Sequence, residues 1–318
     1  MTILSPCVYQ YQLEQAWKRN GALLEFYISR LQPSLQDLHA AISSQNVPKV
    51  RWVLSGLVRE RVDSSIRSTT ALSLAVSLGS VDVVDALLAA GADPNKLSCD
   101  GNGRMEAPLS TAARMDDVVM ARRLVEAGAA LDVLDQDGHS PLWIATRERS
   151  LQMVKLLVEA GAGLDLTGKS SLSPIFLATK FYGREHIAEY LIQQGCRVNT
   201  VDAEGRGPFY WALVNGMERI VRLLIRAGVS PTAKDLSLIT GRKPTWYLTE
   251  NAEFAGWLER ELRRPPSLLR RSATAIRSFL ARPARLPHFA SLLNLPFELH
   301  QALLLAPSPP PSPRRLQP

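Results

Sequence analysis

The chain has 318 residues, of which 46% are hydrophobic, and it carries a formal net charge of +7 at pH 7. All of the excess positive charge lies from Glu259 onward, where ten arginines accompany three glutamates, whereas the preceding residues hold 27 basic and 27 acidic side chains. This balance argues against a nucleic-acid-binding protein, because phosphate contacts require a broad basic face. The sequence also contains no apolar run as long as a membrane span.

The cysteines and histidines indicate neither a disulfide framework nor a metal site. Cys7, Cys99 and Cys196 are odd in number and far apart, and the five histidines form no HExxH motif. Free cysteines are typical of a reducing compartment, so we expect a cytoplasmic protein, with the nucleus as the alternative location. The N-terminus lacks a basic segment followed by a long apolar stretch, and we therefore expect no signal peptide.

Residues 1–36 are expected to form an N-terminal cap. The stretch from Tyr11 to Leu31 has the pattern of one or two amphipathic helices. Such helices would cover the exposed end of the array that follows.

Residues 37–262 contain a repeat of 33 to 34 residues. Pro108, Pro141, Pro174 and Pro208 are spaced by 33, 33 and 34 positions, and a glycine recurs in register. One longer gap between glycines is explained by an insertion from Cys99 to Glu106. A weaker unit occupies residues 37–56 and a degenerate one residues 245–264, so the pattern predicts about six repeats and a degenerate C-terminal unit.

Each unit is predicted to be a pair of helices. Ser140 or Ser173 can cap the first helix by accepting a hydrogen bond from an early backbone N–H, and the proline that follows suits the first helical position. Gly161 ends the second helix, because glycine adopts the left-handed conformation without steric cost. Neither helix buries its apolar face alone, so neighbouring units must stack. The residues expected to face inward are Leu142, Ile144, Ala145, Met153, Val154, Leu156, Leu157 and Val158.

The segment DQDGHSPLWIATRERSLQMVKLLVEAGAGLD resembles the ankyrin repeat almost throughout. The resemblance extends from about Leu38 to Gly228, with weaker units at both ends. It implies an elongated all-α solenoid, and it implies protein binding in place of catalysis.

Departures from the ankyrin pattern mark candidate binding residues. Trp143, Phe176 and Tyr210 replace the histidine of the TPLH motif in three consecutive units, either as a recognition stripe or as packing between helices, and we favour packing. Phe181 and Tyr182 lie where one unit has an extra residue, and an exposed aromatic there would suit a contact. Loop tips and the ends of first helices complete the predicted substrate-binding set, which is His139, Trp143, Arg147, Phe176, Lys180, Phe181, Arg206, Tyr210 and Asn215.

No catalytic motif is present in the sequence. The stretch GNGRME breaks the GxGxxG pattern at its last position, and LITGRKP lacks the residues of a phosphate-binding loop. Acidic residues follow the repeat, which suggests roles in turns and caps. We therefore expect no enzyme, no cofactor and no metal ion.

The chain after Arg263 changes character. The prolines of RRPP end the preceding helix, and Leu268, Ser272 and Ile276 then share one face of a new helix that Ser267 can cap. A second helix is predicted from about Pro296. An apolar unit of only about 40 residues is too small to be stable alone, so it must pack on the array or on a partner.

This C-terminal segment, residues 263–305, resembles a SOCS box, and the whole chain resembles the ankyrin-repeat-and-SOCS-box family. Ser272 stands where the box usually has cysteine, and Asn294 where it usually has proline. The resemblance implies a substrate-recognition subunit of a ubiquitin ligase whose partners are elongin B, elongin C, cullin-5 with its RING partner, and a protein substrate. It implies elongin C contacts by Ser267, Leu268, Ser272 and Ile276, and cullin contacts by Leu293, Leu295, Pro296 and Leu299.

Two other interpretations of the C-terminal segment remain open. Its helices could only cap the solenoid of a plain ankyrin-repeat scaffold. Alternatively, the arginines between Arg260 and Arg285 could attach the protein to an anionic membrane surface. The proline-rich tail, residues 306–318, is expected to be disordered.

Overall fold

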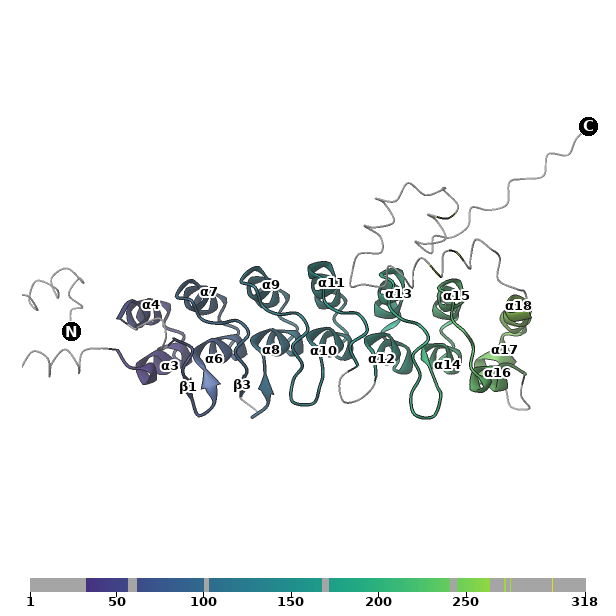
Figure 1. Cartoon of the computed structure of the whole chain (residues 1–318), viewed down its shortest axis with the longest axis horizontal. Coiled ribbons are helices and arrows are strands. Elements are labelled where there is room, and N and C mark those ends of the chain that lie inside the picture. Colours follow the sequence, from purple (N-terminus) through teal and green to yellow (C-terminus); the bar gives the residue numbers. More distant parts are fainter. Residues whose placement is uncertain are drawn as a thin grey trace, which may run out of the picture.

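The computed structural model describes residues 33–56, 62–99, 103–167, 172–240 and 245–263, together with the single positions 272, 275 and 299. Most of the predicted N-terminal cap, nearly all of the predicted SOCS box and the whole tail lie outside these residues. The described helices form an elongated array of two rows (Figure 1).

Six helix pairs make up the array. The inner row consists of α3 (Leu35–Ser43), α6 (Ala71–Ser77), α8 (Pro108–Arg114), α10 (Pro141–Arg147), α12 (Pro174–Lys180) and α14 (Pro208–Val214). The outer row consists of α4 (Val47–Gly56), α7 (Val81–Ala89), α9 (Val118–Glu126), α11 (Leu151–Ala160), α13 (Glu185–Gln193) and α15 (Glu218–Arg226). Each inner helix packs on its outer partner and on the inner helices of adjacent units, so the predicted stacking of helix pairs is present.

A single hydrophobic core runs along the array, from Leu38 to Leu258. All eight residues that the pattern placed inside the fourth helix pair, α10 and α11, are buried, from Leu142 to Val158. Gly161 ends α11 with a φ of 106°, which is the predicted left-handed conformation.

The predicted serine caps are confirmed at one site and wrong at the other. Ser140 Oγ accepts a hydrogen bond from the Trp143 backbone N–H at 3.2 Å, as expected. Ser173 occupies the same position before α12, but its Oγ makes no capping hydrogen bond. Its hydroxyl instead lies 3.3 Å from Thr200 Oγ1, because the neighbouring loop offers a polar partner.

Two short antiparallel hairpins depart from the all-α expectation. Strands β1 (Ser65–Ile66) and β2 (Thr69–Thr70) form one hairpin, and β3 (Ser98–Cys99) and β4 (Met105–Glu106) form the other. The second hairpin contains the insertion that the glycine spacing revealed. The Cys99 N–H donates to the Ser68 carbonyl at 2.8 Å, so the insertion extends the hairpin of the preceding unit.

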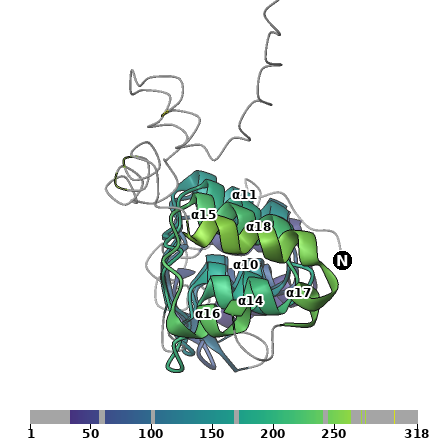
Figure 2. The ribbon, with the colours of Figure 1, turned by 90° about the vertical axis from the view of Figure 1, so that its right-hand side faces the viewer.

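Three further helices cover the C-terminal end of the array. They are α16 (Ala233–Thr240), α17 (Trp246–Glu250) and α18 (Ala252–Arg263). Figure 2 shows α16 and α17 at the end of the inner row and α18 beside α15. Arg222 of α15 lies over the Trp257 ring at 3.9 Å, and Phe254 and Leu258 are buried. Within the described part of the chain, no helix has the length and apolar character needed to cross a bilayer.

The turns between inner and outer helices provide a test of backbone strain. One residue in each turn has a positive φ. It is glycine in three turns and another residue in the other three, with φ 51° at Gln45, 56° at Asp116 and 66° at Arg149. A side chain in this region costs about 1 kcal/mol. We therefore expect Arg149→Gly to raise the free energy of unfolding by about 1 kcal/mol in urea denaturation.

The matched control is Gly79→Ala in the equivalent turn. A Cβ added at Gly79 has no atom within 4 Å, so this substitution changes only the backbone preference. It should lower the free energy of unfolding by about 1 kcal/mol. Equal stabilities of Arg149→Gly and the parent chain would contradict the expected strain.

Candidate protein-binding face

The predicted substrate-binding residues gather on α10, α12, α14 and the loops that flank them. We call this surface the inner-helix face and define it by His139, Trp143, Arg147, Lys180, Phe181, Tyr182, Arg206 and Trp211. In Figure 1 these three helices are consecutive members of the inner row. The side chains of the face are joined by ring stacking and by contacts between cations and aromatic rings.

Trp143 is the centre of the first group. The His139 ring stacks on it with 3.6 Å between centroids and 12° between planes, and the Arg147 guanidinium lies 5.6 Å from the Trp143 ring. His139 is held in place by its loop, because its backbone N–H donates to Asp135 Oδ1 at 2.7 Å. Trp143 is thereby buried, so His139 and Arg147 form the accessible part of this group.

Lys180 is the centre of the second group. Its ammonium lies 5.8 Å from the Phe176 ring, 5.7 Å from Phe181 and 5.3 Å from Trp211. Favourable contacts of this kind place the charge over the ring face. No carboxylate within the described ranges lies at ion-pair distance from Lys180, so its charge is available to a ligand.

Arg206 joins the Trp211 ring from the loop before α14. Its guanidinium lies 5.2 Å from the ring centroid, and its Nε donates to Asp202 Oδ2 at 2.8 Å. The hydrogen bond to Asp202 is the main cause that raises the pKa of Arg206, with the charges of Asp202 and Glu204 adding to it. Arg206 is therefore a fixed, already paired cation, unlike Lys180.

The structure corrects part of the predicted binding set. Phe176 is 1% exposed and Trp143 8%, so these two rings pack between helices and do not form a recognition stripe. Tyr210 is half-buried and meets Trp211 edge to face at 5.4 Å. Asn215 is a structural residue, because its side-chain amide donates to the Thr179 and Lys180 carbonyls at 2.8 and 3.1 Å. It satisfies two carbonyls at the end of α12, so little of its hydrogen-bonding capacity remains for a ligand.

Sequence reasoning missed Trp211 and Arg184. Trp211 is the residue after Tyr210, which stands at the histidine position of the ankyrin motif. This place on the inner helix is the sequence signal that could have identified Trp211 as a candidate. Arg184 is 8% exposed and reaches from the start of α13 to the end of α10, where its guanidinium donates to the Thr146 and Arg147 carbonyls at 3.0 and 2.8 Å. Burial, and then the positive charge of Arg149, lower the pKa of Arg184 below its usual value.

The turn from α12 to α13 contains the extra residue seen in the sequence, and its backbone conformation differs accordingly. Phe181 has an extended backbone, with φ −115° and ψ 138°, whereas Glu148 at the equivalent position is helical. The extra residue leaves Phe181 45% exposed and Tyr182 58% exposed. Two aromatic side chains thus project from one turn of an otherwise regular array.

One other cluster of polar side chains among the described residues resembles a metal site. Asp135, Asp137 and His139 bring potential metal ligands within 4.8 Å of one another. Asp135 Oδ1 already accepts hydrogen bonds from the backbone N–H groups of Asp137 and His139, and Asp135 Oδ2 faces Arg114, so this cluster stabilises a turn.

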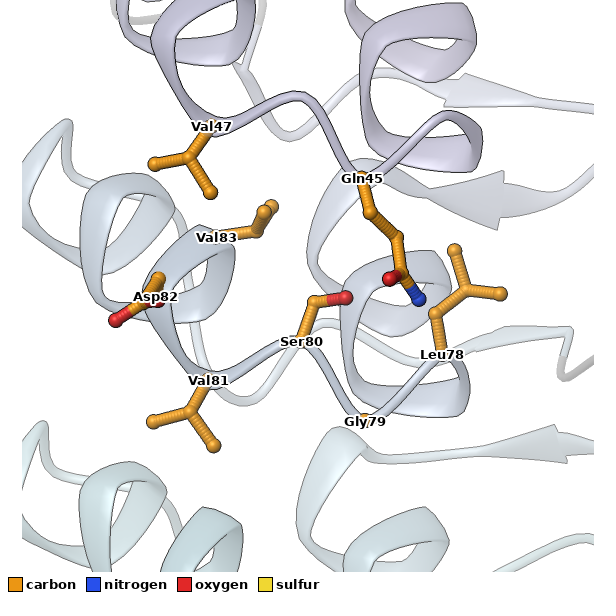
Figure 3. Close-up of a pocket in the computed structure, with 8 residues that line it drawn as sticks. All are labelled: Gln45, Val47, Leu78, Gly79, Ser80, Val81, Asp82 and Val83. Carbon is orange, nitrogen blue, oxygen red and sulfur yellow. The ribbon is translucent and has the colours of Figure 1, made fainter.

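A pocket of about 490 Å³ lies between the turns of the first two units (Figure 3). Gln45 and Val47 line it from the α3–α4 turn, and residues 78–83 line it from the next turn. Asp82 is the single ionisable side chain of this lining, which offers no pair of groups for acid–base chemistry.

The predicted elongin and cullin contacts fall almost entirely outside the described residues. Ser272 is helical and exposed, and Leu299 is helical and half-buried. The remaining six positions of these two sets are not among the described residues, so both sets stay predictions.

Comparisons with known proteins agree with the observed fold. A family model described as ankyrin repeats in three copies matches residues 98–170 and 163–235, and an ankyrin repeat model matches residues 68–98. Together these matches span more than half of the chain. The inactive serine/threonine-protein kinase TEX14 of Bos taurus is 33% identical over 106 residues, which are 33% of this chain and only 7% of that protein.

Two solved structures share the arrangement of helices. An ankyrin repeat domain from Acinetobacter baumannii AYE matches with a TM-score of 0.55 and 23% identity, covering 61% of this chain and 98% of that one. The ankyrin repeat domain of Bcl-3, described as a unique member of the IkappaB protein family, matches with a TM-score of 0.55 and 27% identity. That match covers 61% of this chain and 86% of the Bcl-3 chain.

Proposed function

The chain belongs to the ankyrin-repeat proteins, which generally bind other proteins without catalysis, and on this premise we propose that it is a protein-binding adaptor. The inner-helix face holds the partner. The observation that carries this proposal is the exposed pair Phe181 and Tyr182 beside Lys180, whose ammonium has no carboxylate at ion-pair distance among the described residues. Aromatic side chains that are already held in place lose little conformational freedom on binding, and such residues often dominate interfaces.

The adaptor's second contact is assigned to the C-terminal segment. In this proposal Leu268, with Ser272 and Ile276, enters an apolar pocket of elongin C, while Leu295 and Pro296 contact cullin-5. The chain then acts as the substrate-recognition subunit of a cullin-RING ubiquitin ligase. It does no bond chemistry itself, and it brings a substrate lysine close to the charged ubiquitin-conjugating enzyme.

The C-terminal end of the array is already covered by helices, which favours partner docking, and not capping, as the role of the C-terminal segment. Helices α16 to α18 cover the last complete unit, with Phe254 and Leu258 buried and Trp257 packed on Arg222. The solenoid therefore has a cap before Ser267 is reached. The further apolar helix pair that the sequence predicts after this point is better explained by a partner than by a second cap.

Co-expression with elongin B and elongin C, followed by size-exclusion chromatography, tests the ligase proposal. We expect a stoichiometric complex that is lost in Leu268→Asp, because a buried carboxylate without a partner opposes docking. The matched control is Thr274→Asp, which places the same charge on the side of the predicted helix opposite residues 268, 272 and 276. This control should still co-elute with the elongins.

A folded parent chain that elutes without the elongins would contradict the ligase proposal and favour the plain ankyrin-repeat scaffold. In that scaffold, Leu268→Asp should lower the urea midpoint of the array, whereas the ligase proposal expects an unchanged midpoint. Salt-sensitive binding of the chain to anionic vesicles in place of the elongins would instead favour a membrane-surface adaptor.

A further inference from the structure

The turns that end α10 and α12 bring together four cationic side chains, Arg147, Arg149, Lys180 and Arg184. Arg184 spans the two turns through its hydrogen bonds to the end of α10, and its guanidinium lies 5.4 Å from the Phe181 ring. Lys180 lies against the same ring at 5.7 Å. Arg149 faces Gly183, since a Cβ added to that glycine would lie 3.4 Å from Arg149 Nη1. We call this group, with Phe181 and Tyr182, the turn cluster.

The turn cluster has more positive charge than it neutralises. Glu148 pairs with Arg147, with 2.6 Å between Arg147 Nη2 and Glu148 Oε1. Arg184 is buried and its donors are occupied by backbone carbonyls. Neither Arg149 nor Lys180 has a carboxylate at ion-pair distance among the residues that the structure describes. Two cations therefore stand unpaired beside two exposed aromatic rings.

We propose that the turn cluster binds an acidic segment of a partner protein, in which carboxylates lie next to an apolar or aromatic side chain. The carboxylates pair with Arg149 and Lys180, and the apolar side chain packs on Tyr182 and Phe181. This proposal rests on the protein-binding function given above and names the chemistry of the partner.

Charge and exposed aromatic rings favour an acidic protein segment over a nucleic acid or a membrane. Within the described part of the chain, the cluster presents two cations without a carboxylate partner, whereas a phosphate backbone requires a broad basic surface. The residues before Glu259 are balanced, with 27 basic and 27 acidic side chains, so the positive charge here is local. The exposed rings of Phe181 and Tyr182 suit a hydrophobic anchor, which is how protein interfaces gain most of their affinity.

Selection of peptides from a random displayed library against the full chain tests the proposal. We expect the selected peptides to be enriched in Asp and Glu beside an aromatic or aliphatic residue, and their affinity to fall as salt is added. Arg149→Glu/Lys180→Glu should weaken the best peptide about tenfold or more. The control Arg122→Glu/Arg226→Glu makes the same change in net charge at exposed positions of α9 and α15 and should leave binding nearly unchanged.

A second pair of variants separates the apolar anchor from the charges. Tyr182→Ser removes a side chain that is 58% exposed, and Val119→Ser on α9 removes one that is 59% exposed. Because both side chains are mainly in solvent, both variants should keep the parent melting temperature. Only Tyr182→Ser should weaken the selected peptide, by about tenfold.

The outcomes distinguish this inference from the proposed function. Selected peptides that bind both double variants equally would overturn the turn cluster as the acidic-segment site while leaving a protein-binding function in place. A selection that yields no peptide above background would count against both. Tighter binding to phosphatidylserine vesicles or to a single-stranded oligonucleotide than to any peptide would overturn the choice of an acidic protein.

Discussion

Replacing Arg114 with alanine is expected to lower the free energy of unfolding by about 3 to 5 kcal/mol. Arg114 Nη2 lies 2.6 Å from Glu106 Oε2 and 3.3 Å from Asp135 Oδ2. The Glu106 and Asp135 side chains are only 1% and 2% exposed, so removing Arg114 leaves two buried carboxylates without their cation. Thr111 Oγ1 donates to Glu106 Oε1 at 2.8 Å, but one neutral hydrogen bond does not replace a charge.

The position of this cluster explains why the loss should be large. Glu106 is in β4, Arg114 ends α8, and Asp135 is in the loop before α10, so the three residues join the inserted hairpin to two units. Burial opposes the charge of Arg114, but hydrogen bonds and charges from Glu106 and Asp135 outweigh it and raise the pKa of Arg114. The cation is thus held by its two partners.

Chemical denaturation measures the effect, and Arg123→Ala is the matched control. Arg123 is half-exposed on α9, and its two ion pairs, at 3.7 and 3.8 Å, lie in solvent, so its loss should cost less than about 1 kcal/mol. Adding Glu106→Gln to Arg114→Ala should restore part of the stability by removing one uncompensated charge. Equal losses for Arg114→Ala and Arg123→Ala would show that the buried cluster contributes no special stability.

Arg184→Ala is expected to have the second largest effect, a loss of about 3 kcal/mol. The Arg184 guanidinium donates to the Thr146 and Arg147 carbonyls in the last turn of α10. The Thr146 carbonyl also accepts the Arg149 backbone N–H at 3.3 Å, so the loss should fall mainly on the Arg147 carbonyl. Hydrogen bonds from a charged donor contribute about 1.5 to 3 kcal/mol, and loss of the contact with Phe181 adds to this. The urea midpoint should fall accordingly.

Asn215 allows a comparison with a neutral donor, because its side chain also binds carbonyls at the end of an inner helix, one unit further along the array. Its amide donates to the Thr179 and Lys180 carbonyls at the end of α12. Since this donor is neutral, Asn215→Ala should cost about 1 kcal/mol, less than Arg184→Ala. Arg219→Ala, which removes a mainly exposed arginine of α15, should change stability little. The prediction is wrong if Arg184→Ala is no more damaging than Arg219→Ala.

These two cross-unit contacts also bear on function. Arg184 fixes the start of α13 against α10, and Phe181 and Tyr182 lie in the turn just before it. A binding site on a loop is most effective when the loop is already held in its bound form. Arg184 therefore positions the aromatic residues of the turn cluster, although its own donors are occupied.

The sequence by itself determined the repeat, the helix pairs and much of the candidate site. The spacing of prolines and glycines, and the apolar pattern between them, are local signals, and they located α10 and α11 with all eight predicted inward residues buried. The extra residue at Phe181 and Tyr182 was visible as a break in the period, and it correctly predicted an exposed aromatic turn. Arg147, Lys180 and Arg206 were found because they lie at loop tips and at the ends of inner helices.

Only the tertiary structure decided which polar and aromatic side chains face a neighbour and which face solvent. Phe176 and Trp211 are both aromatic residues of inner helices, yet Phe176 is 1% exposed while Trp211 is half-buried and meets two cations. Asn215 and Arg184 bind carbonyls that lie 35 to 38 positions away in the chain, and the Ser173 hydroxyl approaches Thr200. These choices depend on contacts between successive units, and a pattern that repeats along one unit contains no information about the side chain that the next unit places against it.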